Sequence, residues 1–145
     1  SFTVGLIHAT GELVMHLGMP EQMQFLNEDA PPFSARRARV EHKLLGYCFA
    51  DVGGGFAQRW EFPLPIVEAI AHQLAPFDND AYEPLAGILH LAAWRTRARE
   101  EGLSPGALAD TFPGEVALAL GIDIDEILSL DSMDWTTRQE AAAML

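Results

Sequence analysis

The segment TVGLIHATGELVMHL, residues 3–17, determines the fold, because other parts of the molecule have to cover its apolar side chains. Its apolar residues recur at the spacing of one helix face, and Gly18 is a typical C-terminal stop, so the pattern predicts a helix over residues 3–17. A helix that starts abruptly with an apolar stripe needs a surface to cover it. We therefore expect residues 2–17 to lie exposed at a groove or against another chain, so that an oligomer could form through this helix.

Beyond this segment the sequence gives helical signals only. Apolar periodicity between Gly, Pro and capping residues predicts helices over residues 21–27, 34–45 (with Ser34 as N-cap), 50–60, 66–74, 82–101, 105–110, 114–120 and 124–130, and one from Trp135. Inward-facing positions include Met23, Phe25, Leu26, Leu85, Ile88, Leu89 and Ala92, and Trp60, Trp94 and Trp135 are expected in helix packing rather than in a ligand cage. No alternating β-branched run reaches strand length, so the predicted fold class is all-α.

Three consecutive glycines, Gly53 to Gly55, lie inside one predicted helix. Glycine in a helix interior costs roughly 1 kcal/mol relative to alanine, so the run indicates close packing of another helix or local loosening. A phosphate-binding loop is the functional alternative. It lacks the following Lys-Ser/Thr and the preceding strand that such a loop requires.

Composition narrows the function classes. The net charge is −12 against only nine Lys and Arg residues, so most of the surface would repel a phosphate backbone and nucleic acid is not an expected partner. No uninterrupted apolar run approaches the roughly 18 residues of a membrane helix. The single cysteine, Cys48, allows no internal disulfide and suits a reducing cytoplasm. In its aromatic setting Cys48 is expected to be a small buried hydrophobe rather than a reactive thiol.

Two local basic groups run against the overall charge. The first is Arg36, Arg37, Arg39 and Lys43, of which Arg36, Arg39 and Lys43 share one helix face, and the second is Arg95, Arg97 and Arg99. A solvated helix face beside nearby glutamates is the simpler interpretation. The first group is nevertheless the candidate face for a ligand or a partner.

The five histidines, His8, His16, His42, His72 and His90, form no local metal motif. There is no His-Glu-x-x-His pair, Cys48 has no second cysteine near it, and no Gly-x-Ser-x-Gly turn presents a nucleophile. The residues alone therefore predict no catalytic residue.

Several phrases nevertheless resemble the HDOD branch of the HD superfamily. They are GLIHATGEL (5–13), EHKLLG (41–46) with ADVG (50–53), WEFP (60–63), IVEAIAH (66–72) and ILHLAA (88–93). The first is similar to the family's Gly-Leu-Leu-His-Asp-Ile-Gly, and together they cover about residues 2–93 in the family's order. The resemblance implies an HD-domain-like helical bundle that lacks its N-terminal half, over residues 1–102. It also leaves residues 103–145 as an extension of short helices that packs on the same domain.

Catalytic HD enzymes hold a divalent metal with histidines and aspartates that orient a water for attack on a phosphoester. At the corresponding positions this sequence has Ala9, Phe49, Gln73 and Ala93, none of which supplies a metal-binding carboxylate or imidazole. His8, His72 and His90 remain as a weak all-imidazole remnant, which is more simply a set of core or cleft histidines. No metal, cofactor or catalytic residue is therefore expected.

The resemblance implies a non-enzymatic signal-transduction domain of a bacterial cytoplasm, acting through contacts with protein partners or an attached signalling domain. One alternative is a divergent metal-dependent phosphohydrolase using the three histidines, with a carboxylate such as Glu12 or Glu41 recruited from elsewhere. Another is a nucleotide- or second-messenger-binding module that uses either arginine group.

Overall fold

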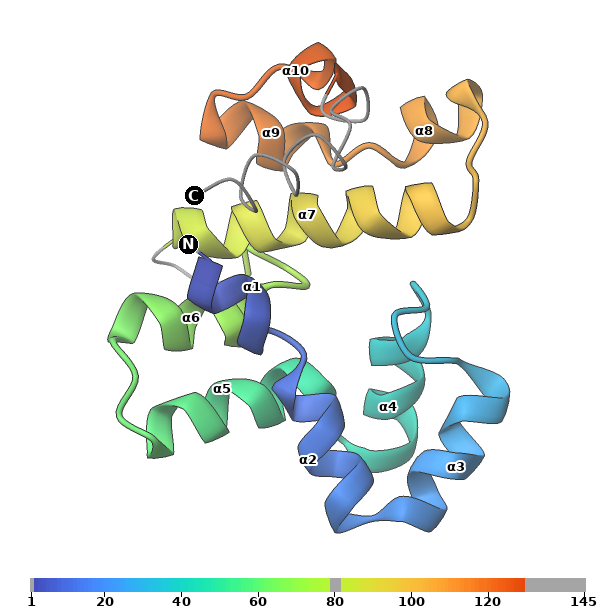
Figure 1. The fold of residues 1–145 in the computed structure, drawn as a ribbon, viewed down its shortest axis with the longest axis vertical. Coiled ribbons are helices and arrows are strands. Elements are labelled where there is room, and N and C mark those ends of the chain that lie inside the picture. The colour runs from blue at the N-terminus through green and yellow to red at the C-terminus, as the bar shows by residue number, and fades with distance from the viewer. Residues whose placement is uncertain (1, 79–81, 130–145) are drawn as a thin grey trace, which may run out of the picture.

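The computed structural model describes residues 2–78 and 82–129, and every regular element within them is a helix, which confirms the all-α fold class (Figure 1). The helices are α1 Phe2–Ile7, α2 Thr10–Gly18, α3 Pro20–Asp29, α4 Arg37–Leu45, α5 Phe49–Arg59, α6 Leu64–His72, α7 Pro84–Glu100, α8 Pro105–Thr111, α9 Gly114–Leu120 and α10 Ile124–Ser129. The helix expected from Trp135 lies outside the described residues. Within these residues, no helix has the length and apolar character needed to cross a membrane.

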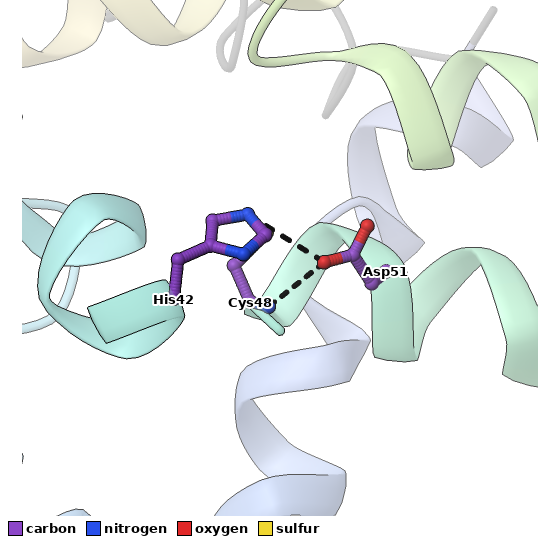
Figure 2. A group of neighbouring side chains, drawn as sticks. All are labelled: His42, Cys48 and Asp51. Atoms are coloured by element: carbon purple, nitrogen blue, oxygen red, sulfur yellow. Dashed lines mark hydrogen bonds and ion pairs between the residues drawn. The ribbon is translucent and has the colours of Figure 1, made fainter. Parts of the chain in front are cut away.

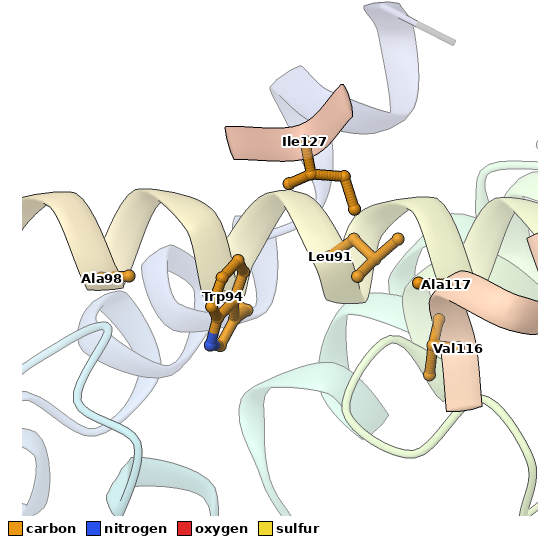
Figure 3. Close-up of a cluster of buried hydrophobic side chains, with 6 residues drawn as sticks. All are labelled: Leu91, Trp94, Ala98, Val116, Ala117 and Ile127. Atoms are coloured by element: carbon orange, nitrogen blue, oxygen red, sulfur yellow. The ribbon is translucent and has the colours of Figure 1, made fainter. Parts of the chain in front are cut away.

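The long helix α7 crosses the middle of the molecule, with α8 to α10 along one side and α1 and α6 on the other (Figure 1). On the first side it contributes to an apolar cluster of Leu91, Trp94, Ala98, Val116, Ala117 and Ile127 (Figure 3). On the second side it contributes to a cluster of Val4, Ala69, Ala86 and Leu89. A helix buried on two faces has no single apolar stripe. The expectation that Ile88 and Ala92 face inward with Leu89 is therefore wrong, because both are exposed.

The short helices expected after Gly102 are present. Ser104 caps α8 by accepting a hydrogen bond from the Ala107 N–H (3.3 Å), Pro105 occupies the first turn, and Gly121 ends α9 with a φ of 69°. The apolar faces of α9 and α10 pack against α7. A domain division at residue 102 stays a prediction.

The single helix expected over residues 3–17 is wrong, because the chain breaks at His8 and Ala9 between α1 and α2. His8 donates its Nδ1 proton to the Gly5 carbonyl (2.7 Å), and Thr10 Oγ1 donates to the Ile7 carbonyl (2.7 Å). These side chains use carbonyls that a continuous helix would need, and such competition favours a helix boundary.

Glycines allow α5 to approach both α2 and α6 closely. A Cβ on Gly11 of α2 would overlap the Phe49 carbonyl oxygen, and one on Gly54 of α5 would lie 2.8 Å from the Cβ of Ala71. The Gly53–Gly55 run therefore serves close helix packing, although Gly55 itself has open space around it. Because α5 is continuous through these residues, the phosphate-loop alternative is wrong.

Some of the other side chains expected to be buried are buried, and some are exposed. Met23 and Leu26 are buried as expected, but Phe25 is 63% exposed because it lies on the solvent face of α3. Trp94 is buried and donates from Nε1 to Thr111 Oγ1 (3.1 Å), whereas Trp60 is 65% exposed at the end of α5 and stacks on Phe56.

The helix expected to follow Ser34 begins only at Arg37. Ser34 Oγ instead accepts a hydrogen bond from the Arg36 N–H (3.3 Å), in a turn entered through Phe33 with a φ of 67°.

The Gly11 contact predicts a clear stability difference between two glycines of the first helices. Gly11→Ala should lower the free energy of unfolding by about 2 kcal/mol or more, since the methyl group has to displace the backbone of α5. Gly5→Ala meets nothing within 4 Å and should raise stability by up to about 1 kcal/mol. Urea unfolding of both variants checks this, and equal midpoints would contradict the packing described.

Candidate functional site

A cleft of about 650 Å³ opens beside α7. Among the residues that line it are His8, Glu12, Phe49, Gln73, His90 and Ala93. These come from the break before α2, from α2, from the start of α5, from the end of α6 and from α7. The cleft therefore lies where the HD resemblance places a metal centre, with Phe49, Gln73 and Ala93 at three of its replaced positions.

Gln73 connects the two histidines of this cleft. Its side-chain Nε2 donates to the His8 carbonyl (2.9 Å) and to the Ile70 carbonyl (2.9 Å), while its backbone carbonyl accepts from His90 Nδ1 (2.9 Å). The side chain is only 4% exposed. The residue that replaces a family histidine thus ties the α1–α2 break to α6 and α7.

His72, the third candidate histidine, does not join His8 and His90. It is not among the residues lining the cleft, and its Nε2 lies 3.2 Å from Glu68 Oε2 one helical turn earlier on α6. The prediction that His8, His72 and His90 form one remnant metal site is therefore wrong. Of the remaining histidines, His16 bonds the Glu12 carbonyl (2.8 Å), and His42 lies at the end of α4.

Arg37 is a charged residue that is almost fully buried, with only 1% of its surface exposed. Its Nε contacts Glu12 Oε1 (3.0 Å) and Glu41 Oε1 (2.7 Å), and its Nη2 donates to Glu12 Oε2 (3.0 Å). Its Nη1 donates to Asn27 Oδ1 (2.8 Å) and to the Ala30 carbonyl (2.6 Å). Arg37 is therefore not part of a ligand face, and that prediction is wrong for it. Arg36, Arg39 and Lys43 are exposed.

Glu41 completes this buried group. It is fully buried, and its Oε2 accepts a hydrogen bond from the Phe49 N–H (2.8 Å) at the start of α5. Burial raises the pKa of Glu41, and the neighbouring Glu12 raises it further, while the Phe49 N–H and Arg37 oppose the rise. Glu12 and Glu41, the carboxylates considered for recruitment, are thus both engaged by Arg37.

The donors at the cleft do not fit a divalent cation of the HD type. His8 and His90 each use Nδ1 on a backbone carbonyl, which leaves Nε2 as the one ligand atom of each imidazole. Within residues 2–78 and 82–129, neither histidine belongs to a group of three His, Cys, Asp or Glu side chains that could hold a metal ion. A catalytic metal site needs about three protein ligands, which these two imidazoles do not supply.

Arg97 lies at the cleft, a position that the sequence did not predict, because it marked Arg97 only as one member of a basic group. It lines the cleft together with Glu100, and its buried Nε has no hydrogen-bond partner in the described part of the chain. The pairing of Arg37 with Glu12 was missed altogether, because the two residues lie 25 positions apart. Only the i, i+4 spacing of Arg37 and Glu41 was a local signal.

Comparisons with known proteins agree with this fold. The HDOD domain family matches residues 1–76. A relative from Treponema pallidum (strain Nichols), named "Uncharacterized protein", is 31% identical over 99 residues, which are 63% of this chain and 18% of the relative. The crystal structure of a "Putative phosphohydrolase" from Shewanella amazonensis SB2B superposes with a TM-score of 0.68 at 27% identity. That match covers 87% of this chain and 46% of the neighbour, so the chain spans less than half the length of either protein.

The buried Arg37 predicts unequal costs for two adjacent arginines. Arg37→Ala should lower the free energy of unfolding by about 3–5 kcal/mol, because it leaves Glu12 and Glu41 buried without a counter-charge. Arg36→Ala removes an exposed ion pair with Asp29 and an exposed hydrogen bond to the Asp29 carbonyl (2.5 Å), and it should cost about 1 kcal/mol or less. Denaturant unfolding gives both values, and similar losses would contradict the burial difference.

Proposed function

The chain belongs to the HDOD family of the HD superfamily, and we propose that it is a non-enzymatic regulatory domain of a bacterial cytoplasm that acts through protein contacts. The observation that carries this proposal is the donor set of the cleft. Ala93, Phe49 and Gln73 line it where catalytic relatives need metal ligands, and the nearby carboxylate of Glu12 is held by Arg37.

Exposed apolar side chains on the first two helices support the contact role. Phe2, Leu6, Leu13 and Leu17 are each at least 60% exposed. Large side chains of this kind gain most from transfer out of water, so their exposure favours association with another apolar surface. We propose that an attached signalling domain or a protein partner meets the molecule at α1 and α2.

The name of the structural neighbour favours a second candidate function, a divergent phosphohydrolase. In that case His8 and His90 would bind the metal at Nε2, and Glu12 would have to leave Arg37 to supply a carboxylate. Breaking a buried ion pair costs several kcal/mol, which makes this arrangement the less favourable one.

Arg97 favours a third candidate, the binding of a small anion such as a nucleotide phosphate in the cleft. Its guanidinium borders an otherwise mainly apolar space, and arginine forms strong paired hydrogen bonds with phosphate oxygens. Loss of nucleotide binding in Arg97→Ala, with retention in Arg36→Ala, would identify this function.

Phosphodiester hydrolysis tests the non-enzymatic proposal. The purified chain is incubated with a chromogenic phosphodiester and Mn²⁺, Mg²⁺, Zn²⁺ or Fe²⁺ in turn, and we expect no turnover above the rate with metal alone. His8→Gln is the matched control, because it removes a cleft imidazole that the proposal gives no chemical role. Turnover that disappears in His8→Gln would overturn the proposal, whereas metal binding without turnover would not.

A further inference from the structure

Three side chains of metal-binding type meet where α4 ends and α5 begins. His42 comes from the last turn of α4, Cys48 is the N-cap of α5, and Asp51 lies in the first turn of α5 (Figure 2). Each offers a ligand atom, and these atoms all lie within 4.8 Å of one another. No other such group of three occurs within the described residues.

The local backbone holds this group together. Gly46 ends α4 with a φ of 82°, a left-handed conformation that turns the chain sharply toward α5. Asp51 Oδ2 accepts a hydrogen bond from the Cys48 N–H (2.8 Å), which fixes the carboxylate beside the cysteine. His42 Nε2 lies 3.7 Å from the same oxygen, and Figure 2 shows the imidazole facing the carboxylate across the turn.

We propose that His42, Cys48 and Asp51 bind a zinc-class divalent cation at a site distinct from the cleft. Zinc takes thiolate, imidazole and carboxylate ligands at about 2.0–2.3 Å in a tetrahedral arrangement, so its ligand atoms lie about 3.3–3.7 Å apart. The separation between His42 Nε2 and Asp51 Oδ2 already equals the upper value. None of the three residues lines the cleft.

The burial of the three ligands fits such a site. Cys48 is 2% exposed, whereas the side chains of His42 and Asp51 are about half exposed, so a cation can enter from solvent and keep a water as its fourth ligand. Cys48 is shielded enough that burial raises the pKa of its thiol to about 11. It is therefore no activated nucleophile, and a metal has to displace its proton.

A bound cation would clamp the end of α4 to the first turn of α5. The same segment of α5 carries Phe49, whose N–H bonds Glu41 of α4 (2.8 Å). Binding would therefore stabilise the folded chain and hold one wall of the cleft.

Cobalt and zinc binding by the full chain tests this site. Titration with Co²⁺ should give one equivalent bound, with the ultraviolet absorption band of a thiolate–cobalt bond, and Zn²⁺ should displace it. His42→Gln changes an exposed side chain and should weaken Co²⁺ and Zn²⁺ binding at least about tenfold. Cys48→Ser puts a hydroxyl in place of the thiol at the N-cap, so the cap keeps a hydrogen-bond acceptor while the thiolate band should be abolished.

His72→Gln is the matched control, because His72 also lies beside a carboxylate, at 3.2 Å from Glu68, but has no cysteine near it in the described part of the chain. Its affinity for Co²⁺ and Zn²⁺ should equal that of the unmodified chain. Absence of binding, or binding that persists in His42→Gln and is lost in His8→Gln, would overturn the site. Should Cys48→Ser fail to fold, His42→Gln and the thiolate band of the unmodified chain decide the matter.

Discussion

The pairing of one buried guanidinium with two carboxylates is the interaction on which the packing of α2, α3, α4 and α5 depends. Arg37 of α4 reaches Glu12 on α2, Asn27 on α3 and the Ala30 carbonyl that follows α3, while Glu41 extends the group to the N-terminus of α5. A buried charge without partners is very costly, so the fold has to bring these four helices together around it. The close contact of Gly11 with the α5 backbone then fixes the distance between α2 and α5.

The same pairing engages a carboxylate that lines the cleft. Glu12 lines the cleft beside α7, and its two oxygens are both directed to Arg37. Gln73 spans His8 and His90 in the same neighbourhood, so polar groups there bond one another. The scaffold of the superfamily is kept by interactions within the chain, and its surface carries a mainly apolar cleft and exposed apolar side chains on α1 and α2.

The sequence predicted the helical class, most helix positions and the family, because apolar periodicity and Pro, Gly and Ser stops are local signals. It missed the break at His8 and Ala9, since side-chain hydrogen bonds to the Gly5 and Ile7 carbonyls leave no trace in periodicity. It assigned Arg37 to an exposed face with Arg36 and Arg39, because its main partner Glu12 is distant in sequence. Likewise, His42 and Cys48 belong to no local metal motif in the sequence, and only the turn at Gly46 brings them together with Asp51.

A double-mutant cycle on Arg37 and Glu12 tests the central claim most directly. The free energy of unfolding is measured for the unmodified chain, Arg37→Met, Glu12→Gln and the variant that carries both changes. If the two side chains form the buried pair described, the double change should cost less than the sum of the single changes by more than about 1 kcal/mol. Additivity within about 0.5 kcal/mol would contradict it, because residues without a shared interaction contribute independently.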